Sequence, residues 1–256
     1  MTGVCWAPWS GVRWVLVAGL MLSVCRGAAA GSEANQLTAE ERAQGWQLLF
    51  DGQTPRGWRG YGKAAFPEKG WTVEEGWLKH VARGGGGDVV TDQVYGDFEL
   101  AFEWRSGANA NSGVKYFVRE QGGGAIGHEY QLLDDGARRS RIRSKNETAS
   151  FYDVLAPDID APPHPAGQTN QSRIVVQGDR VEHWLNGRKA LDYELGSARV
   201  RAAVAASKFR NVAAFGTKQP GRLLLQDHGG EIWFRNVKLR VLTVSAESDG
   251  AAASTP

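Results

Sequence analysis

The sequence predicts an all-β protein, built as a jelly-roll β-sandwich of two packed antiparallel sheets. Strand patterns recur at short intervals, turn residues separate them, and helix signals hardly occur after the first forty residues. Strands do not alternate with helix-length segments, which argues against a parallel α/β sheet. The chain has 33 glycines and 10 tryptophans among 256 residues, a composition that suits many turns around an aromatic core.

The first thirty residues are predicted to be a secretory signal peptide. Arg13 precedes an apolar run over 14–24, and three alanines at 28–30 offer a small-residue cleavage site. The run is shorter than the about 20 residues of a membrane-spanning helix, so we expect no transmembrane span in the mature chain and an exported protein, periplasmic or extracellular. A lipid anchor at Cys25 is the less favoured alternative, because Val24 stands where a lipidation box has a small residue.

Residues 31–43 are expected to form an N-terminal linker, 44–243 a single domain and 244–256 a disordered tail. Both cysteines, Cys5 and Cys25, lie in the predicted signal, so the mature chain would have no disulfide and no cysteine-based site. The formal charge is +2, and no basic block interleaved with aromatics occurs, which argues against nucleic acid as a partner. The locally basic run 138–145 is interpreted as an exposed loop.

The elements follow in order along the domain. Thr38 and Glu41 form a capping-box pattern that predicts a short opening helical turn. Alternation of apolar and polar residues, or apolar runs between turn signals, predicts strands at 98–105, 114–119, 173–177, 180–185, 188–193 and 231–242, and the run 127–135 is interpreted as a strand and its end. Asn186-Gly187 is a strong hairpin signal, because both residues tolerate positive φ. The proline-rich segment 156–167 is predicted to be a long ordered loop.

The run from Gly127 to Asp135 carries the strongest functional signal. Side chains alternate faces in an extended chain, so Glu129 and Gln131 should share one face and His128 should lie on the other. A carboxylate beside an amide, with Asp134 at the rim, suits a polyhydroxylated ligand. The alternative is a surface strand that ends in a plain turn.

A second candidate segment, 226–230, follows an apolar strand and ends in paired glycines, which permit close backbone approach to a ligand. Imidazole transfers protons near neutral pH, so His228 is a catalytic candidate, with a hydrogen bond to its own turn as the alternative. Asn111 becomes relevant only if its turn converges with these groups. The chain lacks a Gly-x-Ser-x-Gly elbow, a phosphate-binding glycine loop and a His-Glu-x-x-His helix.

Several short segments, in a fixed order, carry a family resemblance. They are Gly45–Gly52, Gly96–Leu100, Asn111–Gly113, Glu129–Asp134, Trp184–Gly187, Leu225–Gly229 and Phe234–Val237. As a set they resemble the 3-keto-disaccharide hydrolase domain family, whose fold is similar to the concanavalin A-like lectin and glucanase sandwich. The resemblance covers about residues 44 to 242. Two positions depart from the family pattern: Thr169 replaces a tryptophan, and Ala149 stands where glycine is usual.

The resemblance implies an enzyme that cleaves 3-keto-glycosides. A ketone at C3 acidifies the proton on C2, so a base can remove it, the enolate can expel the C1 substituent, and water can then add. Glu129 or His228 would be the base, and Arg119 and Lys208 the cationic stabilisers. The substrate-binding residues would be Asn111, Gln131, Asp134, Gln226, Asp227, Glu103 and Tyr116.

The residue spacing requires no cofactor, although a divalent metal ion held by oxygens and His228 would be compatible. The expected partners are a carbohydrate and a sugar oxidoreductase that supplies the keto-sugar. Two other functions stay open. One is a non-catalytic carbohydrate-binding module. The other is a conventional glycosidase that uses Glu129 and Asp134 as its two carboxyl groups, although their spacing differs from the Glu-x-Asp-x-x-Glu of glucanases with this fold.

Overall fold

A computed structural model describes residues 34–120, 124–135, 144–160 and 162–243. The predicted signal peptide with Cys25, the predicted tail 244–256 and residues 138–143 of the basic run lie outside these ranges. All the described residues belong to one compact unit. None of the helices in the described ranges combines the length and apolar character needed to cross a membrane.

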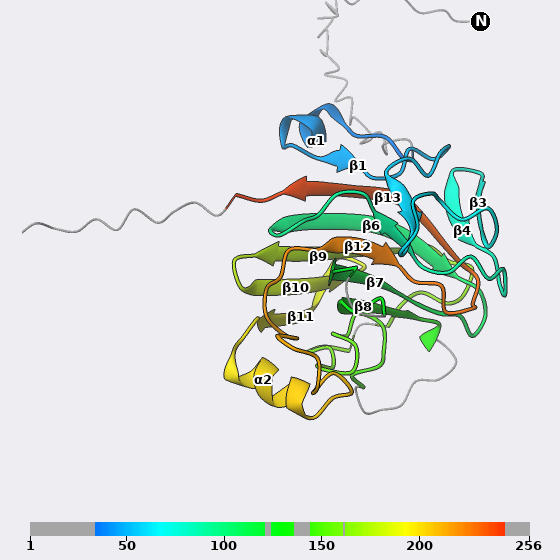
Figure 1. The fold of residues 1–256 in the computed structure, drawn as a ribbon. Coiled ribbons are helices and arrows are strands. Elements are labelled where there is room, and N and C mark those ends of the chain that lie inside the picture. The colour runs from blue at the N-terminus through cyan, green and yellow to red at the C-terminus, as the bar shows by residue number, and fades with distance from the viewer. Residues whose placement is uncertain (1–33, 121–123, 136–143, 161, 244–256) are drawn as a thin grey trace, which may run out of the picture. The chain divides into compact units, whose positions relative to one another are not determined.

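Two antiparallel sheets confirm the predicted sandwich (Figure 1). The eight-stranded sheet contains, in spatial order, β11 (Arg188–Glu194), β10 (Arg180–Leu185), β9 (Asn170–Gln177), β6 (Phe98–Ser106), β13 (Ile232–Val241), β4 (Trp77–His80) and β3 (Trp71–Glu74), with β1 (Gln47–Leu48) also paired to β13. The five-stranded sheet contains β2 (Trp58–Gly60), β5 (Val89–Thr91), β12 (Arg222–Leu225), β7 (Asn111–Val118) and β8 (His128–Leu133).

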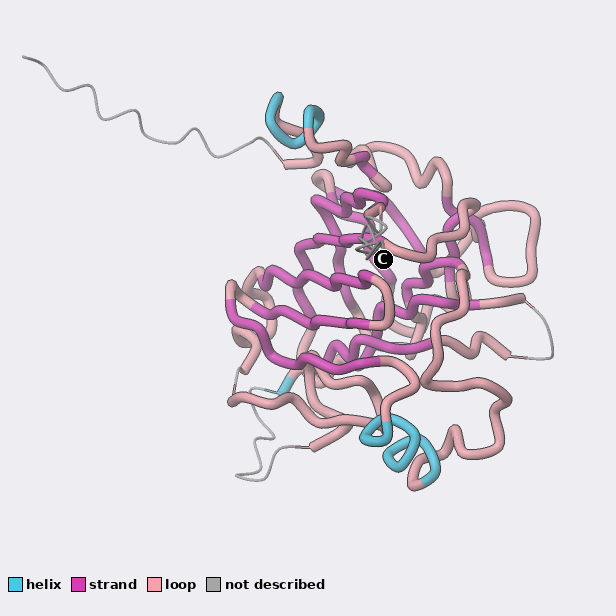
Figure 2. Tube along the Cα trace, turned by 90° about the vertical axis from the view of Figure 1, so that its left-hand side faces the viewer, coloured by secondary structure: helices cyan, strands magenta, loops and turns pink. Residues whose placement is uncertain are grey.

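Two helices complete the described fold and lie at opposite ends of the stack of strands, as Figures 1 and 2 both show. Helix α1 (Ala39–Ala43) begins with the predicted capping box between Thr38 and Glu41. Helix α2 (Ala198–Ala205), capped by Ser197, was not predicted. Its sequence is mostly alanine and arginine, and it buries only Val200 and Val204, so its apolar period is weak.

The predicted strand alternation is confirmed along β6. Its apolar residues from Phe98 to Trp104 are buried between the sheets, and most of the intervening side chains are partly exposed. Glu99 departs from this pattern, because it is buried and paired with Arg173 and Arg240. The Asn186-Gly187 turn has positive φ at both residues, 47° and 78°, which confirms the predicted hairpin between β10 and β11.

The alternation predicted for β7 is wrong beyond Tyr116, because the strand contains a bulge. Phe117 has a φ of 60°, and the register between β7 and β12 shifts beside it. Tyr116 and Phe117 therefore both enter the main core, and Val118 joins Val90 in a small cluster on the outer face of the five-stranded sheet. Phe117 and Val118 therefore each face the side opposite to the predicted one.

The free edge of β8 is covered by residues 148–152. The backbone N–H of Tyr152 donates to the carbonyl of Glu129 at 3.0 Å, and that of Ala149 donates to the carbonyl of Gln131 at 3.0 Å. Ala149 has a φ of 66°, a left-handed conformation that disfavours any side chain with a Cβ. This geometry explains why glycine suits that position.

We predict that Ala214→Gly raises the free energy of unfolding by about 0.5–1 kcal/mol. Ala214 is exposed and has a φ of 56°, so glycine relieves left-handed strain and loses no buried surface, at a modest cost in chain entropy. Ala149→Gly should leave the free energy of unfolding nearly unchanged. The relief of strain is offset by the loss of a fully buried methyl group, which contributes about 0.8 kcal/mol. Urea unfolding measures both changes; equal gains at the two positions would contradict this reasoning.

Candidate active site

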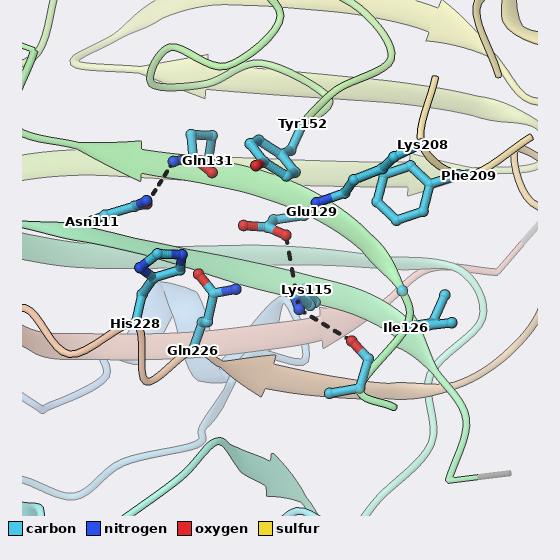
Figure 3. Close-up of a pocket in the computed structure, with 12 residues that line it drawn as sticks. Asn111, Lys115, Ile126, Glu129, Gln131, Tyr152, Lys208, Phe209, Gln226 and His228 are labelled. Carbon is cyan, nitrogen blue, oxygen red and sulfur yellow. Dashed lines mark hydrogen bonds and ion pairs between the residues drawn. The ribbon is translucent and has the colours of Figure 1, made fainter. Parts of the chain in front are cut away.

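A pocket of about 220 Å³ lies on the outer face of the five-stranded sheet (Figure 3). Strands β7 and β8 supply its floor, and four connecting segments, before and after β8, after α2 and after β12, supply its walls. The lining residues are Asn111, Lys115, Ala125, Ile126, Gly127, Glu129, Gln131, Tyr152, Lys208, Phe209, Gln226 and His228. The pocket therefore collects groups that are far apart in the sequence onto one side of a single sheet.

Glu129 lies at the centre of the pocket. The predicted alternation of β8 is confirmed: Glu129 and Gln131 face the pocket, and Tyr130 and Leu132 enter the core. His128 also faces inward, among aromatic rings, and burial lowers its pKa to about 3. Its unprotonated Nε2 accepts a hydrogen bond of 3.0 Å from the backbone N–H of Gly216, which ties the loop after α2 to β8.

Gly113 makes room for the Glu129 carboxylate. It pairs with Gln131 on the neighbouring strand, and a Cβ at this position would lie 2.4 Å from Oε1 of Glu129. Real Cβ atoms do not approach an oxygen so closely, so any larger residue would displace the carboxylate. The glycine of the Asn-Ser-Gly segment is therefore required by close approach, since its own φ is not positive.

Two ammonium groups flank the buried carboxylate, and both point toward it in Figure 3. Nζ of Lys115 lies 3.8 Å from Oε2 of Glu129 and donates to the carbonyl of Ala125 at 3.1 Å. Glu129 is 4% exposed. Burial raises its pKa to about 7, although the positive charges of Lys115 and Lys208 act in the opposite direction. The carboxyl group can therefore accept or donate a proton near neutral pH.

One side of the pocket carries amides, and another carries aromatic rings. Nε2 of Gln131 donates to Oδ1 of Asn111 at 2.7 Å, which fixes both amides, and Gln226 lies nearby. The Lys208 ammonium lies 4.1 Å from the ring centroid of Tyr152 and 5.0 Å from that of Phe209. Amides suit sugar hydroxyls, and aromatic rings suit the apolar faces of a sugar.

Six of the predicted site residues meet in this pocket: Asn111, Glu129, Gln131, Lys208, Gln226 and His228. His228 is exposed and lines the pocket from the loop after β12. Because these residues converge, the alternative interpretation of segment 127–135 as a plain surface strand is not supported. Five other predicted residues lie elsewhere.

Arg119 does not line the pocket, because it follows the bulge at Phe117 and is exposed beyond the end of β7. Tyr116 was also misassigned: it is fully buried, and its hydroxyl contacts Nε2 of His183 at 3.0 Å and the hydroxyl of Tyr193. Desolvation raises the pKa of Tyr116 far above its ordinary value. Its bonds belong to the core and not to a ligand site.

The three remaining carboxylates already have protein partners outside the lining. Glu103 lies on β6, in the other sheet, and accepts from Nε of Arg235 at 2.7 Å. Asp134 accepts from the backbone N–H of Asn109 at 2.9 Å. Asp227 is paired with His80, 2.8 Å away. The substrate-contact role predicted for these residues therefore needs correction.

The sequence reasoning missed Lys115, Tyr152, Phe209 and Ile126. Lys115 alternates with buried residues and pairs with Glu129 across β7 and β8, so correct pairing of the two strands would have revealed it. The other three come from loops, and their approach to the sheet depends on long-range contacts that leave no local pattern.

The described residues contain no group of three or more His, Cys, Asp and Glu side chains placed to hold a metal ion. Glu129 and His228 are the acidic and imidazole groups among the pocket's described lining, and two lysines neighbour the carboxylate. This donor set fits a divalent cation poorly, because hard cations prefer several oxygen ligands. We therefore derive no step through a metal.

Comparison with known proteins gives consistent matches. A family model for a 3-keto-alpha-glucoside-1,2-lyase-like domain matches residues 45–240. A 3-keto-disaccharide hydrolase from Bacteroides thetaiotaomicron is 32% identical over 243 residues, and the match covers 82% of this chain and 83% of that protein.

Two crystal structures of candidate glycosyl hydrolases from Parabacteroides distasonis ATCC 8503 are similar in fold. One has a TM-score of 0.73 and 31% identity, with coverage of 82% of this chain and 100% of that chain. The other has a TM-score of 0.61 and 23% identity, with coverage of 77% and 99%, and supports the fold alone.

We predict that Glu129→Gln makes the protein relatively more stable as the pH rises. The folded pKa of Glu129 is about 7 and its ordinary value is 4.5, so the folded state binds more protons between these values. Wild-type stability is therefore lost as pH rises through this window, and the variant escapes that loss. The difference in unfolding free energy should grow by about 2 kcal/mol from pH 5 to pH 8.

Urea unfolding of both proteins at the two pH values measures this difference. Glu68→Gln, on the exposed surface, is the matched control and should show no such growth. A constant difference between wild type and Glu129→Gln across the range would mean that the carboxyl group titrates normally.

Proposed function

We propose that this chain, which belongs to the 3-keto-alpha-glucoside-1,2-lyase-like domain family, is a hydrolase that cleaves 3-keto-glycosides by elimination and hydration. The observation that carries the proposal is the Glu129 carboxyl group, 4% exposed, flanked by two ammonium groups, with a pKa of about 7. When the pKa of a base is near the working pH, a large fraction of the base is unprotonated, and it is still basic enough to take a proton from the substrate.

Glu129 removes the proton from C2 of the 3-keto-sugar. The electron pair of that C–H bond moves into the C2–C3 bond, and the ketone oxygen at C3 becomes an enolate oxygen. Lys115 and Lys208 stabilise this negative charge, and the pocket excludes much of the water that would screen it. Lys115 thus takes the stabilising role that sequence analysis gave to Arg119.

The enolate then reforms the C3 ketone and expels the C1 substituent, which leaves a double bond between C1 and C2. The leaving oxygen needs a proton. His228, at the mouth of the pocket, and Glu129, which holds the proton taken from C2, are the two donors available in the lining. Water next adds its hydroxyl to C1 and a proton to C2, so the sum of the steps is hydrolysis.

The amide side of the pocket positions the sugar. Asn111 and Gln131 hold each other at 2.7 Å and present their remaining donors and acceptors toward the pocket, and Gln226 adds a third amide. Tyr152 and Phe209 add aromatic rings to the lining. Fixed groups of this kind hold the C2 proton against the base, which lowers the entropic part of the barrier.

Two alternatives from the sequence are less well supported. A conventional glycosidase needs two carboxyl groups about 5–9.5 Å apart, but Glu129 is the one carboxylate among the described lining residues, and Asp134 is bound to Asn109. A non-catalytic binding module would rely on an aromatic platform, whereas charged and amide groups predominate here. We also propose that the protein is exported. A sugar oxidoreductase would then supply the keto-sugar.

We predict that the purified protein cleaves a 3-keto-glucoside and leaves the parent glucoside intact, because the C2 proton is acidic only beside the ketone. Glu129→Gln should lower the turnover of the keto-glucoside about 10²-fold or more. Release of the free sugar, measured with and without a chelator, tests both points. Cleavage of the parent glucoside at a similar rate would point to the glycosidase, and binding without cleavage would point to the binding module.

We predict that kcat/KM for the keto-glucoside rises with pH through about 7, because Glu129 must be ionised to act as base. Lys115→Met removes a positive charge that favours the carboxylate, so it should move this rise to higher pH and lower the maximum. Lys69→Met, at an exposed position, should leave the profile unchanged. A profile whose midpoint stays in place in Lys115→Met would exclude the electrostatic coupling.

A further inference from the structure

His80 is a fully buried histidine whose two ring nitrogens both lie close to oxygen atoms. It ends β4, and its Nδ1 lies 2.7 Å from the carbonyl oxygen of Gly230. Its Nε2 lies 2.8 Å from Oδ1 of Asp227. The edge of the Trp71 ring packs against it, with 5.0 Å between ring centroids. The histidine thus lies under the loop 226–230, whose residues Gln226 and His228 line the pocket.

These contacts connect the ring to the loop 226–230 at two points. A carbonyl oxygen only accepts, so Nδ1 carries a proton. Asp227 also accepts from the backbone N–H of Gly229 and of Gly87, at 2.9 Å each, so both of its oxygens act as acceptors. Nε2 of His80 lies at ion-pair distance from the same carboxylate, so the ring contacts both ends of the segment 227–230.

The same loop is fixed at its other residues. The backbone N–H of Asp227 donates to Oδ1 of Asp88 at 2.8 Å, and that of Gln226 donates to the carbonyl of Gly113 at 3.0 Å. The carbonyl of Gly229 accepts from Arg83 at 3.1 Å. His228 is the exposed side chain in the middle of this anchored segment.

We propose that His80 is a positioning residue whose contacts with Gly230 and Asp227 fix the loop that presents Gln226 and His228 to the pocket. The catalytic consequence rests on the proposed function, but the anchoring does not. Loss of these contacts frees the loop, and misplacement of reacting groups by about 1 Å can cost 10²-fold in rate. The loss falls on kcat more than on KM, because Asn111 and Gln131 still hold the sugar.

The test compares His80→Gln with His183→Gln in the full chain. His183 is also fully buried and bonded through both nitrogens, but its partners are Tyr116 and Ala149 in another part of the sandwich. We expect the amides of 227–230 to exchange hydrogen at least 10-fold faster in His80→Gln alone. We also expect kcat to fall about 10-fold or more there, with KM within about 3-fold of wild type.

Equal loss of stability in both variants, with loop exchange at the wild-type rate, would mean that His80 is structural only. Asp227→Asn supplies the same readouts if His80→Gln fails to fold. The exchange measurement needs no turnover. A chain that cleaves no keto-glycoside would therefore refute the proposed reaction and leave the anchoring role of His80 to be decided by hydrogen exchange.

Discussion

The site depends on one constraint, the burial of alternate side chains of β8. Tyr130 and Leu132 are almost completely buried in the core between the two sheets. A slip of one residue in the pairing of β8 with β7 would bring these side chains to the outer face and place Glu129 in an apolar core. Hydrophobic burial thus fixes the carboxylate opposite Lys115. The position of Glu129 is therefore set by the packing of β8 in the core, which contributes more free energy than any single contact within the pocket.

The loops over the outer face turn this carboxylate into a useful base. On an open sheet, Glu129 would be solvated and would have an ordinary pKa. The bond from the Tyr152 backbone to Glu129 and the bond from Gly216 to His128 hold two loops against β8. These loops remove water from the carboxylate, which raises its pKa, and one of them also supplies Lys208, whose charge limits that rise. The loops that bury Glu129 therefore also supply a positive charge that limits the rise of its pKa.

The parts of the fold that follow from local chemistry could be predicted from sequence. The capping box at Thr38, the Asn186 hairpin and the two faces of β8 each depend on neighbouring residues alone, and the structure confirms them. Arg119 was assigned wrongly because the bulge at Phe117 depends on pairing with β12. Lys115 looked like an ordinary solvated charge, and nothing local reveals that a carboxylate is buried beside it.

The two departures from the family pattern leave the described pocket lining unchanged. Thr169 lies outside that lining, and its carbonyl bonds Nδ1 of His164, so the loss of a tryptophan there takes no ring from the pocket, whose aromatic side is Tyr152 and Phe209. Ala149 has the positive φ that suits glycine, so its side chain adds strain to the segment along β8. That strain persists because its backbone bonds to β8 hold it, which is how a packed fold tolerates an unfavourable residue beside a functional site.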